Sequence, residues 1–448
     1  MNENTENLQS QSKSNSQLTR KLIALAVLIG VSWVATMFVW NVIQERESIQ
    51  KVASNEISEQ WGRSQLIAGP VITIPVEKTV VTITGEKVIN TTTLTLLPQN
   101  LAYDSQIESQ LLKRGVYETP VYTTIIKGTG NFDLSDIDLE SSADTRIIWD
   151  QAVVSINVSD PRGISSMFDL TWNEELLQMQ PSSKFSTLNE SGVHTNLTID
   201  PSQSNHRFSF ELPLKGSLNI SFLPLGENTD VTIKSNWNAP SFIGEFLPKE
   251  RDLAENGFEA KWNITAYGKN LPQYWLSNST NVDGEVLVSK KFGVSLYQEV
   301  DFYTMVDRAT KYSILFITLT FLTFFMYEVL VRLRIHPMQY LLVGLAIALF
   351  YLLLLSFAEI IGFLPAYLIS TIATTTLITS YCFSILKVKK RALSIATLLI
   401  ALYGYLYILL QLEELSLLFG SILLFGVLST VMYLTRDLDW YSVNHTNQ

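Results

Sequence analysis

Cysteine and histidine are scarce in this chain of 448 residues, which contains one cysteine and four histidines. Cys382 lies in an apolar stretch, so the remainder of the chain has no disulfide and no thiol or cysteine-based zinc chemistry. His194, His206, His336 and His445 are too scattered to form an obvious metal site, although the first two bracket a predicted hairpin and leave a cross-strand pair open. We therefore expect no metal, no cofactor and no redox role.

The common catalytic and nucleotide-binding motifs are also absent. The sequence contains no HExxH, GxSxG, GxxxxGK[ST] or GxGxxG. Its apolar stretches offer scattered serine, threonine and tyrosine, without a partnered base that would activate a nucleophile. We expect a protein that is not an enzyme, and a membrane-embedded enzyme is the least favoured alternative.

Positive charge is sparse in the middle of the chain. Residues 45 to 308 contain 34 acidic and 21 basic residues, a net charge of −13, whereas the other residues carry 8 acidic and 11 basic ones. An acidic surface keeps a domain soluble and repels both nucleic acid and anionic lipid head groups. Neither is expected as a partner of this region.

Long uncharged runs are what the sequence has in abundance. Residues 22 to 43 form a run of 22 residues, where about 20 suffice to span a bilayer. The run ends in Val39, Trp40, Asn41, Val42 and Ile43 rather than in small residues, so it predicts an uncleaved anchor. Five more apolar stretches follow, at 312 to 331, 338 to 357, 366 to 386, 392 to 411 and 415 to 435. The lipid bilayer is thus a predicted partner, with six spans.

The distribution of basic residues between these stretches predicts their orientation, because short cytoplasmic loops retain positive charge. One side collects the basic residues, namely Arg20, Lys21, Arg332, Arg334, Lys387, Lys389, Lys390, Arg391 and Arg436. The short loops on the other side carry Glu359, Glu413 and Glu414 without any lysine or arginine. We therefore expect both termini in the cytoplasm and residues 45 to 308 outside it.

The outer region is predicted to be mainly β, because short runs of aliphatic residues and threonine alternate with turn residues. Residues 66 to 84 and 88 to 97 flank a Gly-Glu-Lys turn and predict a hairpin. The fold class is an integral membrane protein with an α-helical bundle of six spans and a large mainly-β domain outside the cytoplasm. The predicted divisions are a disordered tail (1–21), an anchor helix (22–43), the β domain (44–308), a five-helix bundle (309–436) and a second tail (437–448).

Ionisable residues near the membrane are the candidate functional groups, since a charge at depth is costly and often functional. Glu328 stands four residues before Arg332, the favourable helical order for an ion pair, and its functional alternative is a proton or ligand site. Glu359, Glu413 and Glu414 at outer helix ends could form an acidic rim. We expect Arg308 and Lys311 to be the counter-charges of that rim. The full candidate set is Arg308, Glu328, Glu359, Glu413 and Glu414.

Several long phrases of the sequence resemble the CreD family of bacterial inner-membrane proteins. They include RATKYSILFITLTFLTFFMYE (308 to 328), RIHPMQYLLVGLAIALFYLLLLSFAEIIGFLPAYL (334 to 368), RSQLIAGPVITIPV (63 to 76) and SDPRGI (159 to 164). The resemblance covers nearly the whole chain from Glu45 to Tyr441. Departures are mild: Ala358-Glu359-Ile360 stands where the family suggests Ser-Glu-His, and Glu413-Glu414 where it suggests Glu-Asp.

The resemblance implies a bacterial inner membrane, a periplasmic domain and a role in cell envelope integrity and stress tolerance, without an agreed biochemical activity. Two functions follow as hypotheses. In the favoured one, the β domain binds a periplasmic protein or envelope component and the helices anchor it. In the alternative, the helix bundle transports a lipid, peptide or ion, with Glu328, Glu359 or Glu414 lining the path. Nothing in the sequence specifies an oligomeric state.

Overall fold

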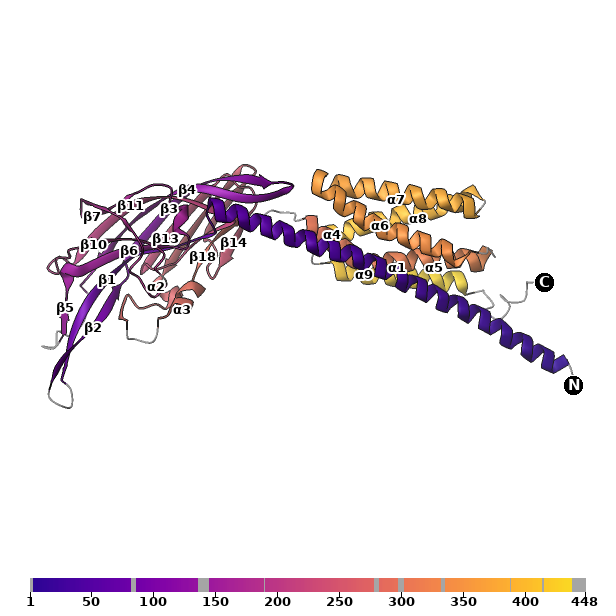
Figure 1. Ribbon diagram of the computed structural model, residues 1–448, viewed down its shortest axis with the longest axis horizontal. Helices are drawn as coiled ribbons and strands as arrows, with labels where there is room; N and C mark the ends of the chain where they lie inside the picture. The colour runs from indigo at the N-terminus through magenta and orange to yellow at the C-terminus, as the bar shows by residue number, and fades with distance from the viewer. Residues whose placement is uncertain are drawn as a thin grey trace. The chain divides into compact units, whose positions relative to one another are not determined.

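The computed structural model describes residues 3–81, 86–135, 145–188, 190–277, 282–296, 302–331, 335–386, 388–412 and 415–436 (Figure 1). The chain divides into two compact units. The first, which we call the helix bundle, comprises residues 1–50 and 300–448, and the second, the β domain, comprises residues 51–299. Both boundaries of the β domain therefore lie inside the predicted range of 44 to 308.

Seven long or medium helices account for most of the described part of the bundle. They are α1 (Glu3–Trp61), α4 (Phe302–Lys311), α5 (Ser313–Val331), α6 (Pro337–Ile361), α7 (Phe363–Leu386), α8 (Lys389–Gln411) and α9 (Ser416–Thr435). Five helices of the described chain are long and apolar enough to cross a membrane, or six if the pair α4 and α5, bent by 42°, counts as one span. The predicted class of membrane fold is confirmed.

Helix α4 is the element that shifts the domain boundary. Residues 302 to 308, which we had assigned to the β domain, belong to this helix of residues 302 to 311, which buries Tyr303, Val306, Ala309 and Thr310. These positions recur every three or four residues, so they share one face of the helix. That buried face makes α4 part of the bundle.

Helix α1 is longer than the sequence predicted. We expected residues 2 to 19 to be disordered, whereas the helix begins at Glu3 and continues to Trp61. Glutamine, glutamate, lysine and leucine in this stretch are good helix formers, and an adjoining apolar helix supplies the nucleus that a short polar segment lacks. The polar continuation after Ile43, which the sequence did predict, ends at Gly62, whose φ of 144° few other residues adopt.

Two sheets form the β domain. The larger, ten-stranded sheet follows the order β14-β18-β12-β1-β6-β10-β9, while β2 and β5 pair with β1 and β17 pairs with β2. Its strands are β1 (Gln65–Val81), β2 (Lys87–Leu96), β5 (Thr145–Ile147), β6 (Ala152–Val158), β9 (Gln180–Pro181), β10 (Gly192–Leu197), β12 (Asn219–Phe222), β14 (Pro240–Gly244), β17 (Tyr274–Leu276) and β18 (Phe292–Leu296). The predicted hairpin of residues 66 to 97 is confirmed, with Val80 opposite Val88.

The smaller, eight-stranded sheet follows the order β15-β16-β13-β3-β4-β11-β7-β8. Its strands are β3 (Asn100–Arg114), β4 (Tyr117–Asp133), β7 (Asp169–Trp172), β8 (Glu175–Gln178), β11 (Asn205–Ser217), β13 (Asn228–Ser235), β15 (Glu250–Ala254) and β16 (Gly257–Thr265). Short helices α2 (Ala266–Lys269), α3 (Gly284–Ser289), η1 (Trp149–Gln151) and η2 (Pro161–Gly163) join the strands.

The core lies between the two sheets. On β3, buried residues alternate with exposed ones, and Tyr103 of that strand packs against Phe222 of β12 in the other sheet, with ring centroids 4.9 Å apart. The central strand β1 has no exposed residue from Gln65 to Glu77, which is typical of a strand covered on both faces. The eight-stranded sheet instead leaves one face open, and on β3 this face carries Asp104, Gln106 and Glu108.

Candidate functional site

Glu359, a predicted site residue, lies in the last turn of α6 and is bound by two other helices. The Tyr303 hydroxyl of α4 donates a hydrogen bond of 2.9 Å to its Oε1 atom, and Arg46 Nε of α1 lies 4.0 Å from the same oxygen. The Glu359 side chain is only 14% exposed. It is therefore a partly buried, paired carboxylate rather than one held by water alone.

Asp307, next to the predicted Arg308, is a second carboxylate at this end of the bundle. Its Oδ1 atom accepts hydrogen bonds from Trp40 Nε1 at 2.8 Å and Gln44 Nε2 at 3.2 Å, and Lys311 Nζ lies 2.6 Å from Oδ2. Sequence reasoning missed Asp307, although the spacing of four residues to Lys311 was a readable signal. Lys311 thus pairs with Asp307, whereas we had expected it to face the acidic rim.

The rest of the predicted rim is only partly described. Glu413 and Glu414 lie outside the described residues. Arg308 belongs to α4, and Arg46 of α1 is a cation beside Glu359. The rim therefore gains a counter-charge from a helix that the sequence gave no reason to place there.

Glu328 lies near the end of α5 and is bound from two sides. Lys21 Nζ of α1 lies 2.9 Å from Oε1, and the Tyr340 hydroxyl of α6 donates to Oε2 at 3.3 Å. The Glu328 side chain is 11% exposed. Arg332, its predicted partner, lies outside the described residues.

Glu328 and Glu359, the two predicted carboxylates that the structure describes, do not share a site. Tyr340, beside Glu328, is in the first turn of α6, and Glu359 is in its last turn. The rise of 1.5 Å per residue puts them about 28 Å apart along the helix. In each cluster a cation from α1 approaches the carboxylate. The two ion pairs therefore hold α1 against the bundle near both ends of α6.

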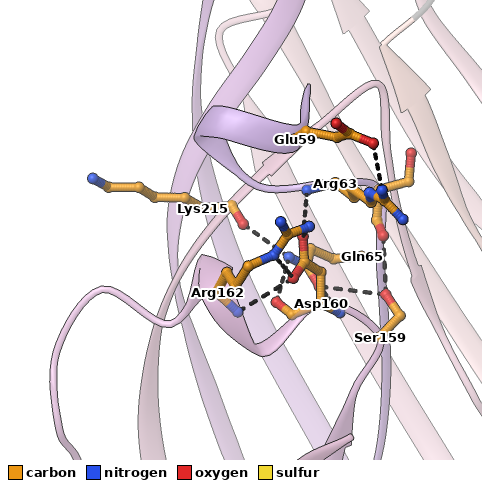
Figure 2. Close-up of polar contacts among 8 residues, drawn as sticks. Glu59, Arg63, Gln65, Ser159, Asp160, Arg162 and Lys215 are labelled. Carbon is orange, nitrogen blue, oxygen red and sulfur yellow. Dashed lines mark hydrogen bonds and ion pairs between the residues drawn. The ribbon is translucent and has the colours of Figure 1, made fainter. Parts of the chain in front are cut away.

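The β domain contains a third polar cluster, at the SDPRGI segment that carried part of the family resemblance (Figure 2). Asp160, 6% exposed, accepts hydrogen bonds from Arg162 Nε at 2.8 Å, Arg162 Nη2 at 2.9 Å and the Arg63 backbone N–H at 3.0 Å. Burial raises the pKa of Asp160, but the hydrogen bonds and positive charge of Arg162 outweigh it and hold that pKa below its usual value.

Gln65 is the centre of this cluster. Its Nε2 atom donates to the backbone oxygens of Asp160 at 3.1 Å and Lys215 at 3.0 Å, and its Oε1 accepts from Asp160 N–H and the Ser159 hydroxyl. In Figure 2 the Lys215 side chain points away from the cluster, so that only its backbone oxygen takes part. Three segments distant in sequence are joined by one buried amide.

Two glycines allow the backbone segments of this cluster to approach one another closely. A Cβ atom at Gly163 would collide with the Lys215 backbone oxygen and with Gln65 Nε2. The φ of 144° at Gly62 likewise places its α-carbon against Lys215, where a Cβ would lie 2.9 Å from the backbone oxygen. The Lys215 ammonium lies over the Trp61 ring, 4.9 Å from the ring centroid. The end of α1 is thus fastened to the strands that follow it, and this cluster is a structural junction.

In the described part of the chain, no group of three His, Cys, Asp or Glu side chains converges. The predicted hairpin between His194 and His206 is wrong, because β10 and β11 belong to different sheets. His194 Nδ1 lies 2.6 Å from the Ser182 backbone oxygen, and His206 Nδ1 lies 2.8 Å from Asn173 Nδ2.

The open face of the eight-stranded sheet has two adjoining grooves, of about 620 and 760 Å³. They share Gln106, Glu108 and Thr123, from β3 and β4. Polar and charged side chains of both signs line them, including Lys127 in one and Lys234 in the other. This surface of the β domain has the shape and the side chains to receive a polar ligand.

These features define a class: a multi-pass membrane protein that inserts one large two-sheet β domain between its first and its later membrane helices. A family model described as "Inner membrane protein CreD" matches residues 17–441. The chain is also similar to the inner membrane protein CreD of Escherichia coli (strain K12), with 32% identity over 432 residues, which cover 95% of this chain and 94% of that protein. The chain therefore belongs to the CreD family of inner membrane proteins, as its sequence phrases indicated.

Proposed function

We propose that this chain supports cell envelope integrity and stress tolerance by binding rather than by catalysis. In this proposal the β domain lies in the periplasm, both termini are cytoplasmic, and the β domain binds an envelope component or partner protein. The observation that carries the proposal is the pair of grooves on the open face of the eight-stranded sheet. A solvated outer face is ordinary for a sheet in a two-sheet domain, but concave grooves lined by converging polar side chains are suited to a ligand.

The orientation rests on the charge of the loops and has its own test. A reporter enzyme active only outside the cytoplasm, inserted at the β7–β8 turn after Asn173, is expected to be active. Activity of a cytosolic reporter at that site would contradict the proposed topology.

The binding role is tested by filling the shared part of the grooves. We expect Thr123→Trp to abolish envelope protection in cells that lack the natural chain, because the indole would occupy both grooves at once. Val116→Trp is the matched control, since Val116 is 51% exposed at the turn between β3 and β4 and lines neither groove. Protein abundance is measured for both variants. Full protection by an abundant Thr123→Trp protein would exclude the grooves as the binding surface.

The alternative, transport of a lipid, peptide or ion through the bundle, has less support. Glu328 and Glu359 each lie beside a cation from α1, at opposite ends of α6, rather than along one path. We expect Glu328→Gln and Glu359→Gln proteins to protect cells nearly as well as the parent chain when their abundance is equal. A complete loss of protection at normal abundance would favour transport.

A further inference from the structure

A cavity of about 730 Å³ lies within the helix bundle, between α5, α8 and α9. Leu322 and Met326 of α5, Leu398 and Leu402 of α8, and Val427 and Val431 of α9 contribute to its mainly apolar lining. Helix α9 has no buried residue between Ser416 and Thr435, so it packs against its neighbours only loosely. Gly426 also lines the cavity and adds no side chain to its wall.

One end of this cavity is polar and lies beside the basic first turn of α8. Tyr327, which lines it, is hydrogen-bonded to the Ser394 hydroxyl, and that hydroxyl donates to the Arg391 backbone oxygen at 2.8 Å. Arg391 and Ser394 precede Leu398 by seven and four residues, so all three share one face of α8. Lys389 and Lys390 add two further charges to the same turn. An apolar trough therefore lies next to the three basic residues at the start of α8.

We propose that this cavity is a binding site for one anionic phospholipid, whose acyl chain lies between α5, α8 and α9 and whose phosphate lies beside Arg391. The volume falls in the range of sites that enclose a small organic ligand. Basic residues at the end of a crevice between membrane helices attract anionic head groups.

The test uses the full chain reconstituted in vesicles of phosphatidylcholine with phosphatidylglycerol that carries a photoreactive acyl chain. After illumination, labelled peptides are mapped. Label is expected on α5, α8 and α9 peptides, several-fold above that on α7, and an excess of unlabelled phosphatidylglycerol is expected to remove it. Equal labelling of all membrane helices, or label that excess lipid does not displace, would overturn the proposal.

Two glycines of α9 provide a matched pair of variants. Neither Gly420 nor Gly426 has an atom within 4 Å of the place where a Cβ would stand, but only Gly426 lines the cavity. We expect Gly426→Leu to lower the labelling of α5 and α8 at least fivefold and Gly420→Leu to leave it within twofold of the parent. Equal effects of the two changes would overturn the proposal. A cross-link between the α9 helices of two copies, without any lipid label, would also overturn it.

The proposed contact between the lipid head group and Arg391 is tested by removing charges at the start of α8. Arg391→Gln is expected to lower the preference for phosphatidylglycerol over photoreactive phosphatidylcholine about fivefold, because the bound phosphate would lose the cation beside it. Lys390→Gln removes the same charge from the neighbouring, exposed position and is expected to change the preference less than twofold. Equal losses in both variants would mean that the charges attract lipid only in general, which would overturn the assignment of Arg391. The parent chain's label map remains the measurement if a variant fails to fold.

Discussion

The Lys21 ammonium nitrogen lies 2.9 Å from Glu328 Oε1, although 307 residues separate the two side chains. This pair joins the start of the first apolar helix to the end of α5, and Tyr340 adds a hydrogen bond from α6. Three helices therefore meet at one carboxylate, so changing its charge should affect how α1 is held.

We predict that Glu328→Lys lowers the thermal stability of the bundle, because two ammonium groups would then face each other and Tyr340 would lose its acceptor. Lys21→Glu in the same chain is expected to recover part of the loss. Since Lys21 is 58% exposed, solvent screens the pair, and the coupling should be only about 0.5 kcal/mol. Unfolding of the four proteins in detergent measures it, with Tyr340→Phe separating the hydrogen bond from the charge. Strictly additive effects of the two charge changes would show that the pair has no coupling.

The membrane part of the fold was largely predictable from sequence, because desolvation makes long uncharged runs unmistakable. What the sequence could not provide is the pairing of distant segments. Reading locally, we assigned Glu328 to Arg332, four residues on, whereas the described partner is Lys21. Asp307 was overlooked for a similar reason, since two of its three donors come from α1.

In the β domain, strands with aliphatic alternation were found and the first hairpin was correct, but strand order was not accessible. The segments 192–197 and 205–217 are adjacent in sequence and looked like a hairpin, yet they enter different sheets. β3 was missed because its exposed positions carry polar side chains such as Asp104, Gln106 and Glu108, which have low strand propensity. Those are the residues that line the grooves, so the candidate binding surface was the part least visible in the sequence.

Asp160 is expected to make the β domain sensitive to acid. Its pKa is lower in the folded chain than in the unfolded one, so the stability it contributes is complete above about pH 4 and is lost as pH falls through the folded value. Asp160→Asn should therefore destabilise the β domain at pH 7, since the charged acceptor of the Arg63 N–H and of Arg162 is lost, although water solvates the 59% exposed Arg162 side chain and limits the cost. The difference between the two proteins should shrink below pH 4. Hydrogen exchange of β-domain amides in the solubilised full chain, followed against pH, is the measurement. A difference that stays constant down to pH 2 would rule out this linkage.

Lys269 is expected to make the stability of the β domain depend on pH in the alkaline range. The side chain is fully buried and donates to the backbone oxygens of Leu225 and Gly226, and burial lowers its pKa to about 8. Between that value and the ordinary 10.5, the unfolded chain binds a proton that the folded chain does not, so stability should rise with pH over this interval.

Lys269→Met removes this titration while keeping much of the side-chain volume. We predict that the stability of the parent β domain, relative to the variant, increases by about 3 kcal/mol between pH 8 and 10.5. The same hydrogen-exchange measurement, confined to amides of β13 and β16, gives the two curves. Parallel curves over that range would mean that the lysine has an ordinary pKa in the folded chain.

Gly344 controls how closely α1 can approach the bundle. A Cβ atom at this position of α6 would collide with Ser32 Oγ, lie 2.8 Å from Ser32 Cβ and lie 3.0 Å from Phe321 Cζ. We predict that Gly344→Ala destabilises the bundle by about 1 to 3 kcal/mol, because well-packed interiors resist even one added methyl group. Gly404→Ala on α8 is the control, since nothing lies within 4 Å of its Cβ position, and the change should be neutral or slightly stabilising.

The cause of the Gly344 effect can be separated from helix propensity by a second change in α1. Ser32→Gly removes both of the Ser32 atoms that the new methyl group would meet, so the double variant should regain stability relative to Gly344→Ala alone, despite the helix propensity lost at residue 32. Thermal unfolding of the full chain in detergent gives the four stabilities. Since alanine is the better helix former, any destabilisation by Gly344→Ala must come from packing, and a further loss in the double variant would mean that α1 does not contact α6 at Gly344.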